Sequence, residues 1–346
     1  MSSDLQSERI PAPILTPAIS GERRPFWSVV VPLYKRTEFL GQCLGSILDQ
    51  DPGPEEMEIL VTDDASPKPL REFVENLGRG RVNYFRNEEN QGLYPSTNNS
   101  IRRAKGHWIH VLHDDDWVDL NFYSKMRKSI EGASDRVGVV FCMYKNIQER
   151  DRTTWSPPAF RHESGVMSRD FLRKLALGNP LNLPAVTYKR SSFEQVGLFR
   201  EDLPFSADWE WYVRSAVSMD WYHNTEQLAF YRVHGNNLTF DLLRQGKTCE
   251  NLRRTIEIFA DILPKDIALS SLPQARQIYA RQFLTTALGG LNQNNHRFAL
   301  RFALEALKVS PDACAYPEFG RLLQHHAAGD FRQKFSTAII KELDGA

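Results

Sequence analysis

Hydrophobic and polar residues alternate in blocks along the chain, and the blocks predict strands and helices in turn. Residues 27–33 (WSVVVPL) form a β-branched run that is typical of a strand buried on both faces. In the next segment Leu40, Leu44 and Ile47 share one helical face, and Thr37 can cap that helix. Strands alternating with helices predict an α/β domain with a mostly parallel sheet. The further predicted strands are 57–66 (MEILVTDDAS, ending in Asp63–Asp64), 81–87, 107–113 and 137–144, and the further predicted helices are 96–105 and 121–130.

The pattern changes in the second half of the chain. Residues 150–165 have mixed charge and a Pro-Pro pair, which indicate a loop. Residues 166–240 are mixed, with one helix (ADWEWYVRSAV) near the centre, and the chain beyond about residue 245 is helical. The residues before Trp27 are rich in Pro, Ser and charge, which is typical of disorder. We therefore expect a disordered arm over 1–26, an α/β domain over 27–240 and a helical C-terminal region over 241–346.

Composition and charge exclude several classes of protein. Lys plus Arg and Asp plus Glu both number 43, so the formal net charge is zero. This balance argues against nucleic acid as the main partner, because phosphate binding needs a basic face. The four cysteines form no Cys-x-x-Cys pair, which argues against a zinc site and favours reduced thiols in a cytosolic protein. No segment has the ~20 apolar residues that cross a bilayer, so we expect a cytoplasmic protein or, at most, peripheral membrane contact.

Three predicted strands end in polar or acidic residues, namely Tyr34–Arg36, Asp63–Asp64 and Asp114–Asp116. In parallel sheets, ligands bind outside the carboxyl ends of the strands. Carboxylates suit Mg²⁺ or Mn²⁺, and a triplet fits a metal that arrives with a phosphorylated ligand. The alternative is a solvated acidic turn that caps the next helix. Asp64 could accept hydrogen bonds from a base or ribose, or it could cap a helix.

Five segments, taken in order, resemble the family 2 glycosyltransferases. They are PLY (32–34), DDAS (63–66), NQGLYPSTNNSI running on to LHDDDW (90–117), GLFREDLPFSADWEWYVR (197–214) and YRVHGNN (231–237). The resemblance covers roughly residues 27–240. It implies an inverting enzyme with the Rossmann-like GT-A fold that uses a nucleotide-diphosphate sugar.

The resemblance also implies roles for single residues. Asp208 would be the catalytic base, Asp64 would bind the nucleobase, and Asp114 would lie near the ribose or sugar. Two departures from the family pattern matter: His113 opens the Asp-x-Asp motif, and Thr97 stands where an arginine is common. The metal register, Asp115 or Asp114 with Asp116, therefore stays open. The remaining implied residues are Pro32, Tyr34, Arg36 and Asn98 for the donor nucleotide, and Asp115, Asp116 and His234 for the metal.

These residues together predict a metal-dependent transferase. It would use Mg²⁺ or Mn²⁺ and move a sugar, with a UDP-sugar as the expected donor, to a hydroxyl of a glycan or lipid-linked acceptor, as in polysaccharide biosynthesis. A nucleotidyltransferase is disfavoured, because VVVPLYKRTEF is not a basic, glycine-rich triphosphate loop. A nucleotide-sugar or glycan binding protein without turnover is the remaining alternative. The sugar and the acceptor stay open.

Overall fold

The computed structural model describes residues 11–17, 21, 23–158, 160 and 162–325. The chain divides into two compact units. The first contains the chain up to Leu172 together with Pro180–His234, and the second contains Arg173–Asn179 and the chain from Gly235 onward. The first unit is an α/β domain and the second is helical, so the expected fold class is confirmed.

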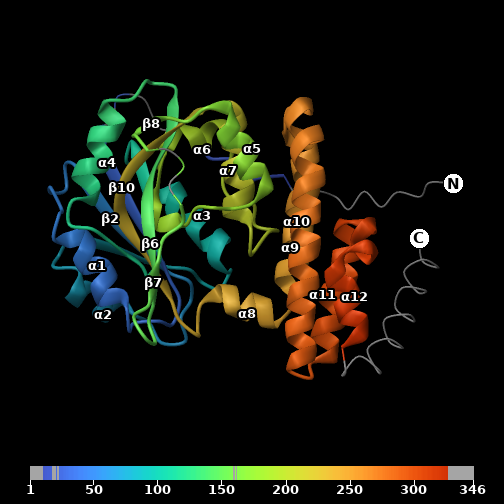
Figure 1. The fold of residues 1–346 in the computed structure, drawn as a ribbon. Helices are drawn as coiled ribbons and strands as arrows, with labels where there is room; N and C mark the ends of the chain where they lie inside the picture. The colour runs from blue at the N-terminus through green and yellow to red at the C-terminus, as the bar shows by residue number, and fades with distance from the viewer. Residues whose placement is uncertain (1–10, 18–20, 22, 159, 161, 326–346) are drawn as a thin grey trace. The chain divides into compact units, whose positions relative to one another are not determined.

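One mixed sheet forms the centre of the first unit (Figure 1). Its strand order is β3-β2-β1-β4-β9-β6-β10-β5, with β7 beside β6 and β8 beside β10. Neighbouring strands run parallel in the β3-β2-β1-β4 part and between β6 and β10, whereas β9 runs antiparallel to both β4 and β6. The strands are β1 Trp27–Leu33, β2 Met57–Asp63, β3 Val82–Arg86, β4 Trp108–Val111, β5 Trp117–Val118, β6 Val137–Gln148, β7 Thr154–Trp155, β8 Gly165–Val166, β9 Val186–Lys189 and β10 Asp220–Val233.

Helices cover both faces of this sheet. Figure 1 shows α1, α2 and α4 on one side and α3, α6 and α7 on the other. Alternate residues of β1, such as Val29 and Val31, join Leu44 of α1 and Phe122 of α4 in one hydrophobic core, as the two-residue period of a strand requires. The helices of this unit are α1 Leu40–Leu48, α2 Arg71–Leu77, α3 Leu93–Arg103, α4 Phe122–Glu131, α6 Arg190–Val196 and α7 Ala207–Ser218; α5, Arg169–Leu177, spans the division between the units.

The second unit is helical, as the sequence predicts for the chain beyond about residue 245. Asn295 caps α11 by accepting a hydrogen bond from the Phe298 N–H at 3.1 Å. Buried Glu305 of α11 pairs with Arg253 of α9 at 2.8 Å. The helices are α8 Leu238–Arg244, α9 Lys247–Ile262, α10 Lys265–Asn292, α11 His296–Val309 and α12 Pro317–Gln324.

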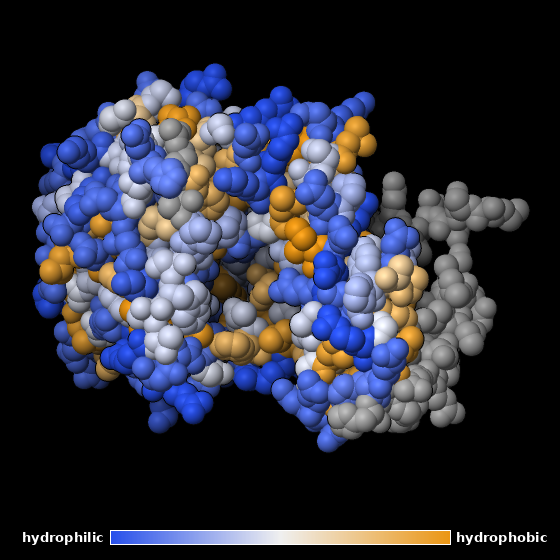
Figure 2. Space-filling model, in the orientation of Figure 1, coloured by the Kyte–Doolittle hydropathy of each residue, from blue (hydrophilic) through white to orange (hydrophobic). Residues whose placement is uncertain are grey.

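On the face that Figure 2 shows, hydrophilic and hydrophobic side chains of the described residues are interspersed. Such scattered apolar residues are ordinary on a folded protein. Within the part of the chain that the structure describes, no helix is both long and apolar enough to cross a bilayer.

Residues 11–17 differ from the expectation of a disordered arm. Leu15 is only 3% exposed, and the Pro13 carbonyl accepts a hydrogen bond from the Leu198 N–H at 2.7 Å. The Thr16 carbonyl lies 3.4 Å from a guanidinium nitrogen of Arg190. Composition alone does not predict this packing. A single buried side chain, Leu15, holds the segment, and its prolines leave few backbone N–H groups that need hydrogen-bond partners.

Candidate active site

The ends of β1, β2 and β4 lie side by side, because these strands are parallel neighbours in the sheet. Two hydrogen bonds join the first two ends: the Asp64 N–H donates to the Leu33 carbonyl at 2.8 Å, and the Lys35 N–H donates to the Ser66 hydroxyl at 2.8 Å. Pro32 is buried within β1, and Tyr34 is half-buried just beyond the strand. The three polar strand ends therefore meet at one edge of the sheet, as the sequence predicts.

The aspartate triplet after β4 is buried. Asp114, Asp115 and Asp116 are 3%, 4% and 1% exposed. The Asp116 N–H closes a turn by donating to the His113 carbonyl at 3.1 Å. The next helix, α4, begins only at Phe122. The alternative of a solvated acidic turn that caps this helix is therefore wrong.

Two arginines supply the positive charge around the triplet. Arg36 donates to Asp115 Oδ2 at 2.7 Å and lies 3.3 Å from Asp114 Oδ1. Arg232 donates its backbone N–H to Asp116 Oδ1 at 2.9 Å and its Nε to the Asp115 carbonyl at 2.8 Å. The Arg232 side chain also pairs with Glu149. Arg232 belongs to the YRVHGNN segment, but the motif gave it no role.

Arg232 is held in place by aromatic rings. Its guanidinium carbon lies 4.2 Å from the Phe39 ring centroid and 4.6 Å from that of Trp117. Its Nη2 donates to Gln42 Oε1 at 2.5 Å. Because Arg232 is only 2% exposed, it is a fixed part of the domain interior.

The same turn offers a set of metal ligands. One ligand atom each from His113, Asp115 and Asp116 can be chosen so that all lie within 4.8 Å of one another. His113 Nε2, Asp114 Oδ2 and Asp116 Oδ2 are buried and have no hydrogen-bond partner among the described residues. Buried polar atoms of this kind are costly unless a ligand satisfies them, so this donor set fits a divalent cation. The sequence flagged His113 only as a departure from the family motif, and the structure adds it as a candidate ligand.

His234 reaches this cluster through Asp115. Its Nε2 lies 3.0 Å from Asp115 Oδ2 and 3.3 Å from Arg36 Nη1. The Phe39 ring lies beside the imidazole, with centroids 5.1 Å apart. The structure therefore brings all three predicted metal residues, Asp115, Asp116 and His234, to one place.

Burial and mutual repulsion set the protonation of the three carboxyls. Burial and the charge of Asp115 raise the pKa of Asp114 to about 7, against the opposing charge of Arg36. Burial and Asp115 likewise raise the pKa of Asp116. Burial alone would raise the pKa of Asp115, but the hydrogen bond from His234 and the charge of Arg36 hold it below its usual value. Asp115 is thus the carboxylate that stays ionised most readily.

The carboxylate of Asp64 accepts hydrogen bonds from four donors within the protein. It accepts hydrogen bonds from the Asn87 side chain at 2.8 Å and the Asn90 side chain at 3.0 Å. The backbone N–H groups of Gln91 and Gly92 also donate to it, at 3.1 and 2.9 Å. Four donors occupy the positions that a carboxylate offers, so a nucleobase could bond to Asp64 only if one of them moved.

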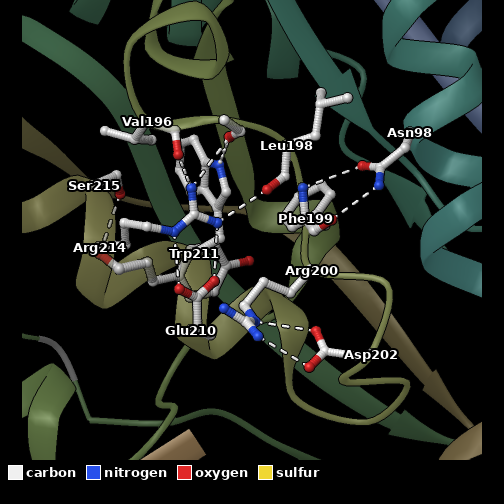
Figure 3. A network of polar contacts seen from close by, with 12 residues as sticks. Asn98, Val196, Leu198, Phe199, Arg200, Asp202, Glu210, Trp211, Arg214 and Ser215 are labelled. Atoms are coloured by element: carbon white, nitrogen blue, oxygen red, sulfur yellow. Dashed lines mark hydrogen bonds and ion pairs between the residues drawn. The ribbon is translucent and has the colours of Figure 1, made fainter. Parts of the chain in front are cut away.

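Both the amide nitrogen and the amide oxygen of the Asn98 side chain form hydrogen bonds within the protein. Its Nδ2 donates to the Phe199 carbonyl at 2.9 Å and to Glu201 Oε1 at 3.0 Å, and its Oδ1 accepts from the Phe199 N–H at 3.1 Å (Figure 3). Asn98 is 0% exposed. In this structure it joins α3 to the segment that precedes α7.

Asp208 lies in the first turn of α7, which a polar network holds at its N-terminal half (Figure 3). Arg214 donates to Glu210 Oε1 at 2.8 Å and to the Leu198 carbonyl at 2.9 Å. Trp211 donates its Nε1 to the Gly197 carbonyl at 2.8 Å. Glu210 is therefore committed to Arg214, whereas Asp208 is half-buried on another side of the helix. The two carboxylates face different ways, as their spacing predicts.

Tyr94 connects α3 with Asp208. Burial raises the pKa of the Tyr94 hydroxyl well above its usual value, and the charge of Asp208 and a hydrogen bond to it act in the same direction. Tyr94 packs against Phe199, with ring centroids 5.5 Å apart. Sequence reasoning missed Tyr94, whose only signal was its place in the NQGLYPSTNNSI segment.

Comparison with known proteins identifies the family. Residues 28–197 match the model of glycosyl transferase family 2. Residues 28–197, about half of the chain, form a glycosyl transferase family 2 domain. The match includes the ends of β1, β2 and β4, and hence the aspartate triplet. The recognition made from the sequence motifs is thus confirmed.

Curated relatives of this chain are glycosyltransferases that are distant in sequence. The glycosyltransferase EpsJ of Bacillus subtilis is 25% identical over 230 residues, which cover 62% of this chain and 63% of EpsJ. The GalNAc(5)-diNAcBac-PP-undecaprenol beta-1,3-glucosyltransferase of Campylobacter jejuni is 30% identical over 152 residues, 43% of this chain and 48% of that protein. The match therefore spans less than two thirds of either relative.

Solved structures of glycosyltransferases show the same fold. TarS 1-349 of S. aureus in complex with UDP has a TM-score of 0.64 at 15% identity, with 92% of each chain covered. The mannosyltransferase PcManGT of Pyrobaculum calidifontis, in complex with GDP-Man and Mn²⁺, has a TM-score of 0.53 at 17% identity, with 94% of this chain and 86% of that chain covered. At these identities the likeness establishes the GT-A fold.

Proposed function

We propose that this family 2 member is an inverting, metal-dependent glycosyltransferase that takes its sugar from a nucleotide-diphosphate donor. The observation that carries the proposal is the buried Asp114–Asp116 turn, with unfilled carboxylate oxygens and a histidine at the carboxyl edge of a parallel sheet. The complexes of TarS with UDP and UDP-GlcNAc, and of PcManGT with GDP-Man and Mn²⁺, support it. A UDP-sugar is the first donor to test.

The metal would be held by Asp115 and Asp116, with His113 and His234 as nitrogen donors close by. When bound, a divalent cation neutralises the negative charge that develops on the leaving diphosphate. Mg²⁺ prefers an all-oxygen environment, whereas imidazole suits the transition metals better. We therefore favour Mn²⁺ over Mg²⁺.

The chain's own residues would supply the remaining functions. Asp208 would take the proton of the acceptor hydroxyl as that hydroxyl attacks, and general base help of this kind is worth ~10²–10⁴-fold in rate. Tyr94 would orient the Asp208 carboxylate through their hydrogen bond. Attack on the face opposite the leaving group inverts the anomeric centre without a second carboxylate as nucleophile. Glu210 cannot share this role, because Arg214 occupies it.

The donor nucleotide would lie against the ends of β1 and β2. Pro32, Tyr34 and Arg36 would line its pocket, and Asp114 would lie near the ribose or sugar. Asp64 would contact the base only after one of its four donors moved, and otherwise it would shape the Asn90–Gly92 loop. Asn98 would support the site by joining α3 to Phe199.

The acceptor would be a hydroxyl of a glycan or of a lipid-linked saccharide, as the undecaprenol-linked substrate in the name of the Campylobacter jejuni relative suggests. A lipid-linked acceptor would place the protein in the cytoplasm, in peripheral contact with the membrane. We assign donor chemistry to residues 27–240 and leave residues 241–325 as a separate helical region; residues 326–346 lie outside the described residues.

An experiment that separates turnover from binding tests this function. The purified protein is incubated with UDP-, GDP-, CDP- and dTDP-sugars plus Mn²⁺ and a panel of glycan and undecaprenol-linked saccharide acceptors, and the release of nucleoside diphosphate as the sugar moves to the acceptor hydroxyl is measured. Wild type should release it from one donor class. Asp208→Asn should lower that rate by ~10²–10⁴-fold, because the base is lost, while the donor Kd stays nearly constant.

A matched control keeps the result interpretable. Asp220→Asn removes a carboxylate that pairs with Arg136 at the surface beyond the other end of α7, and it should release nucleoside diphosphate like wild type. If Asp208→Asn behaves like this control, Asp208 is not the base. If wild type binds a donor and releases no diphosphate with any acceptor of the panel, the protein is a binding protein without turnover.

A further inference from the structure

Arg36 forms ion pairs with Asp114 and Asp115, which are the carboxylates beside the proposed metal and donor positions. We propose that Arg36 is an exchangeable cation: it neutralises Asp114 and Asp115 in the free protein, and it transfers to the diphosphate of the donor when a divalent metal takes its place. This inference rests on the proposed function and adds a positioning role to it. It predicts that metal and diphosphate bind cooperatively because they exchange one guanidinium.

Arg36 occupies one of the two carboxylate oxygens of Asp115, a member of the candidate metal cluster. Its Nη1 lies 2.7 Å from Asp115 Oδ2, and Asp115 supplies one of the ligand atoms of the candidate metal cluster. His234 Nε2 contacts the same oxygen at 3.0 Å. A divalent cation that binds Asp115 next to His234 competes with the guanidinium for this carboxylate, so we expect metal binding to move Arg36 away from Asp115.

Arg36 is placed so that it can move. Its side chain is 31% exposed, whereas those of Asp114 and Asp115 are 3% and 5% exposed. It stands outside any helix or strand, directly after Lys35, whose φ of 65° turns the chain beyond β1. Rotation about its side-chain bonds is enough to withdraw the guanidinium toward solvent.

The second arginine of the site, Arg232, is held in place and cannot move as Arg36 can. Arg232 is 2% exposed, stacked between Phe39 and Trp117, and tied to Gln42 and to the Asp115 carbonyl. Moving it would break the packing around the turn. Only one of the two cations that neutralise the triplet can therefore leave without disturbing the fold.

The chemistry of the guanidinium fits its second position. Arginine forms bidentate hydrogen bonds with phosphate oxygens and keeps its charge at all physiological pH values. A divalent ion carries more charge than the guanidinium it displaces, so the carboxylates stay neutralised during the exchange. The released Arg36 then neutralises part of the diphosphate.

The test measures two affinities that Arg36→Gln should change in opposite directions. Calorimetry gives the Kd of Mn²⁺ alone, and then the Kd, at saturating Mn²⁺, of whichever of UDP, GDP, CDP, dTDP and ADP binds wild type most tightly. Arg36→Gln should bind Mn²⁺ about fivefold more tightly, because a competing cation is gone. It should bind the nucleoside diphosphate about tenfold more weakly, because a charged hydrogen-bond donor is lost.

Two further variants make the result specific. Lys35→Gln removes the same charge from the neighbouring residue, whose ammonium lies over the Tyr34 ring, and it should change each Kd by less than about twofold. Arg36→Lys keeps the charge without the bidentate geometry, so it should bind Mn²⁺ like wild type and the diphosphate more weakly.

Three outcomes would overturn the inference. If Arg36→Gln weakens both ligands, Arg36 is a structural support of the site. If it leaves the Mn²⁺ Kd unchanged, Arg36 does not compete with the metal. If wild type binds neither Mn²⁺ nor any of the nucleotides, the proposed function itself fails, and this result is distinct from the other two because it appears in the unmodified protein.

Discussion

At the scale of single residues, carboxylates with the same chemistry have different surroundings and therefore different tasks. Asp64 accepts four hydrogen bonds from the 87–92 loop, whereas Asp116 keeps one buried oxygen without a partner among the described residues. The sequence predicted that both would lie at the edge of the sheet, because parallel strands end there. It could not predict their partners, because Arg232 is more than a hundred residues away from Asp116 along the chain.

The buried His110 of β4 predicts how the stability of the fold depends on pH, independently of the active site. It is fully buried, with Nδ1 3.0 Å from the Tyr123 hydroxyl and Nε2 3.0 Å from the Pro184 carbonyl. Burial lowers its pKa from 6.5 to about 4, so the unfolded chain binds a proton between these values that the folded protein does not. Stability should therefore fall as pH decreases through this window.

The size of this effect can be measured by urea unfolding at pH 7.5 and pH 5. The free energy of unfolding of wild type should drop by about 2 kcal/mol more than that of His110→Gln, because only wild type carries this buried imidazole. The surface variant His162→Gln should show the full wild-type drop. Equal drops in wild type and His110→Gln would contradict the assignment.

At the scale of elements, the strands before residue 145 follow the hydrophobic pattern closely, whereas the mixed segment 166–240 contains strands that were not predicted, among them the 14-residue β10. The predicted strand at 27–33 is confirmed as β1, and the predicted strand in 57–66 is confirmed as β2, which ends at Asp63. The sequence did not predict β9, which is only four residues long and inserts antiparallel between β4 and β6. A short segment of this kind gains its strand conformation from its neighbours in the sheet, and its own sequence has no periodicity that would predict a strand.

The link between α3 and the segment before α7 predicts a loss of stability on substitution. Asn98→Ala would leave the buried N–H and carbonyl of Phe199 without their partner, and we expect this to lower the free energy of unfolding by about 2 kcal/mol. Asn99→Ala, next along the same helix but half-buried, should stay within about 0.5 kcal/mol of wild type. Chemical denaturation of the three proteins measures the difference.

A donor-binding assay on the same variant decides between two roles. If folded Asn98→Ala keeps the nucleotide Kd of wild type, Asn98 acts on stability alone. A strongly raised Kd together with a wild-type free energy of unfolding would instead favour the direct donor contact that the family resemblance implies.

At the scale of the whole molecule, the sequence placed the change from mixed to helical structure near residue 240. The contact pattern divides the chain after His234 and also assigns residues 173–179 to the helical unit. This second feature could not be predicted, because 173–179 begin inside α5, and no change in composition marks the point. His234 is therefore the last residue of the unit that holds the aspartate triplet.

The central claim is that the Asp114–Asp116 turn binds a nucleoside diphosphate together with a divalent metal. Thermal unfolding with UDP, GDP, CDP, dTDP or ADP, each with and without Mn²⁺, tests it most directly in wild type and Asp115→Ala. Asp49→Ala, which removes an exposed carboxylate at the end of α1, is the control. A ligand at ~100 times its Kd stabilises by ~2.7 kcal/mol, so a shift in Tm should be visible.

The account predicts that one nucleotide raises the Tm of wild type and of Asp49→Ala only when Mn²⁺ is present, and that it leaves Asp115→Ala unchanged. If no nucleotide shifts wild type under any condition, or if the shift survives in Asp115→Ala without Mn²⁺, the metal-dependent donor site is contradicted.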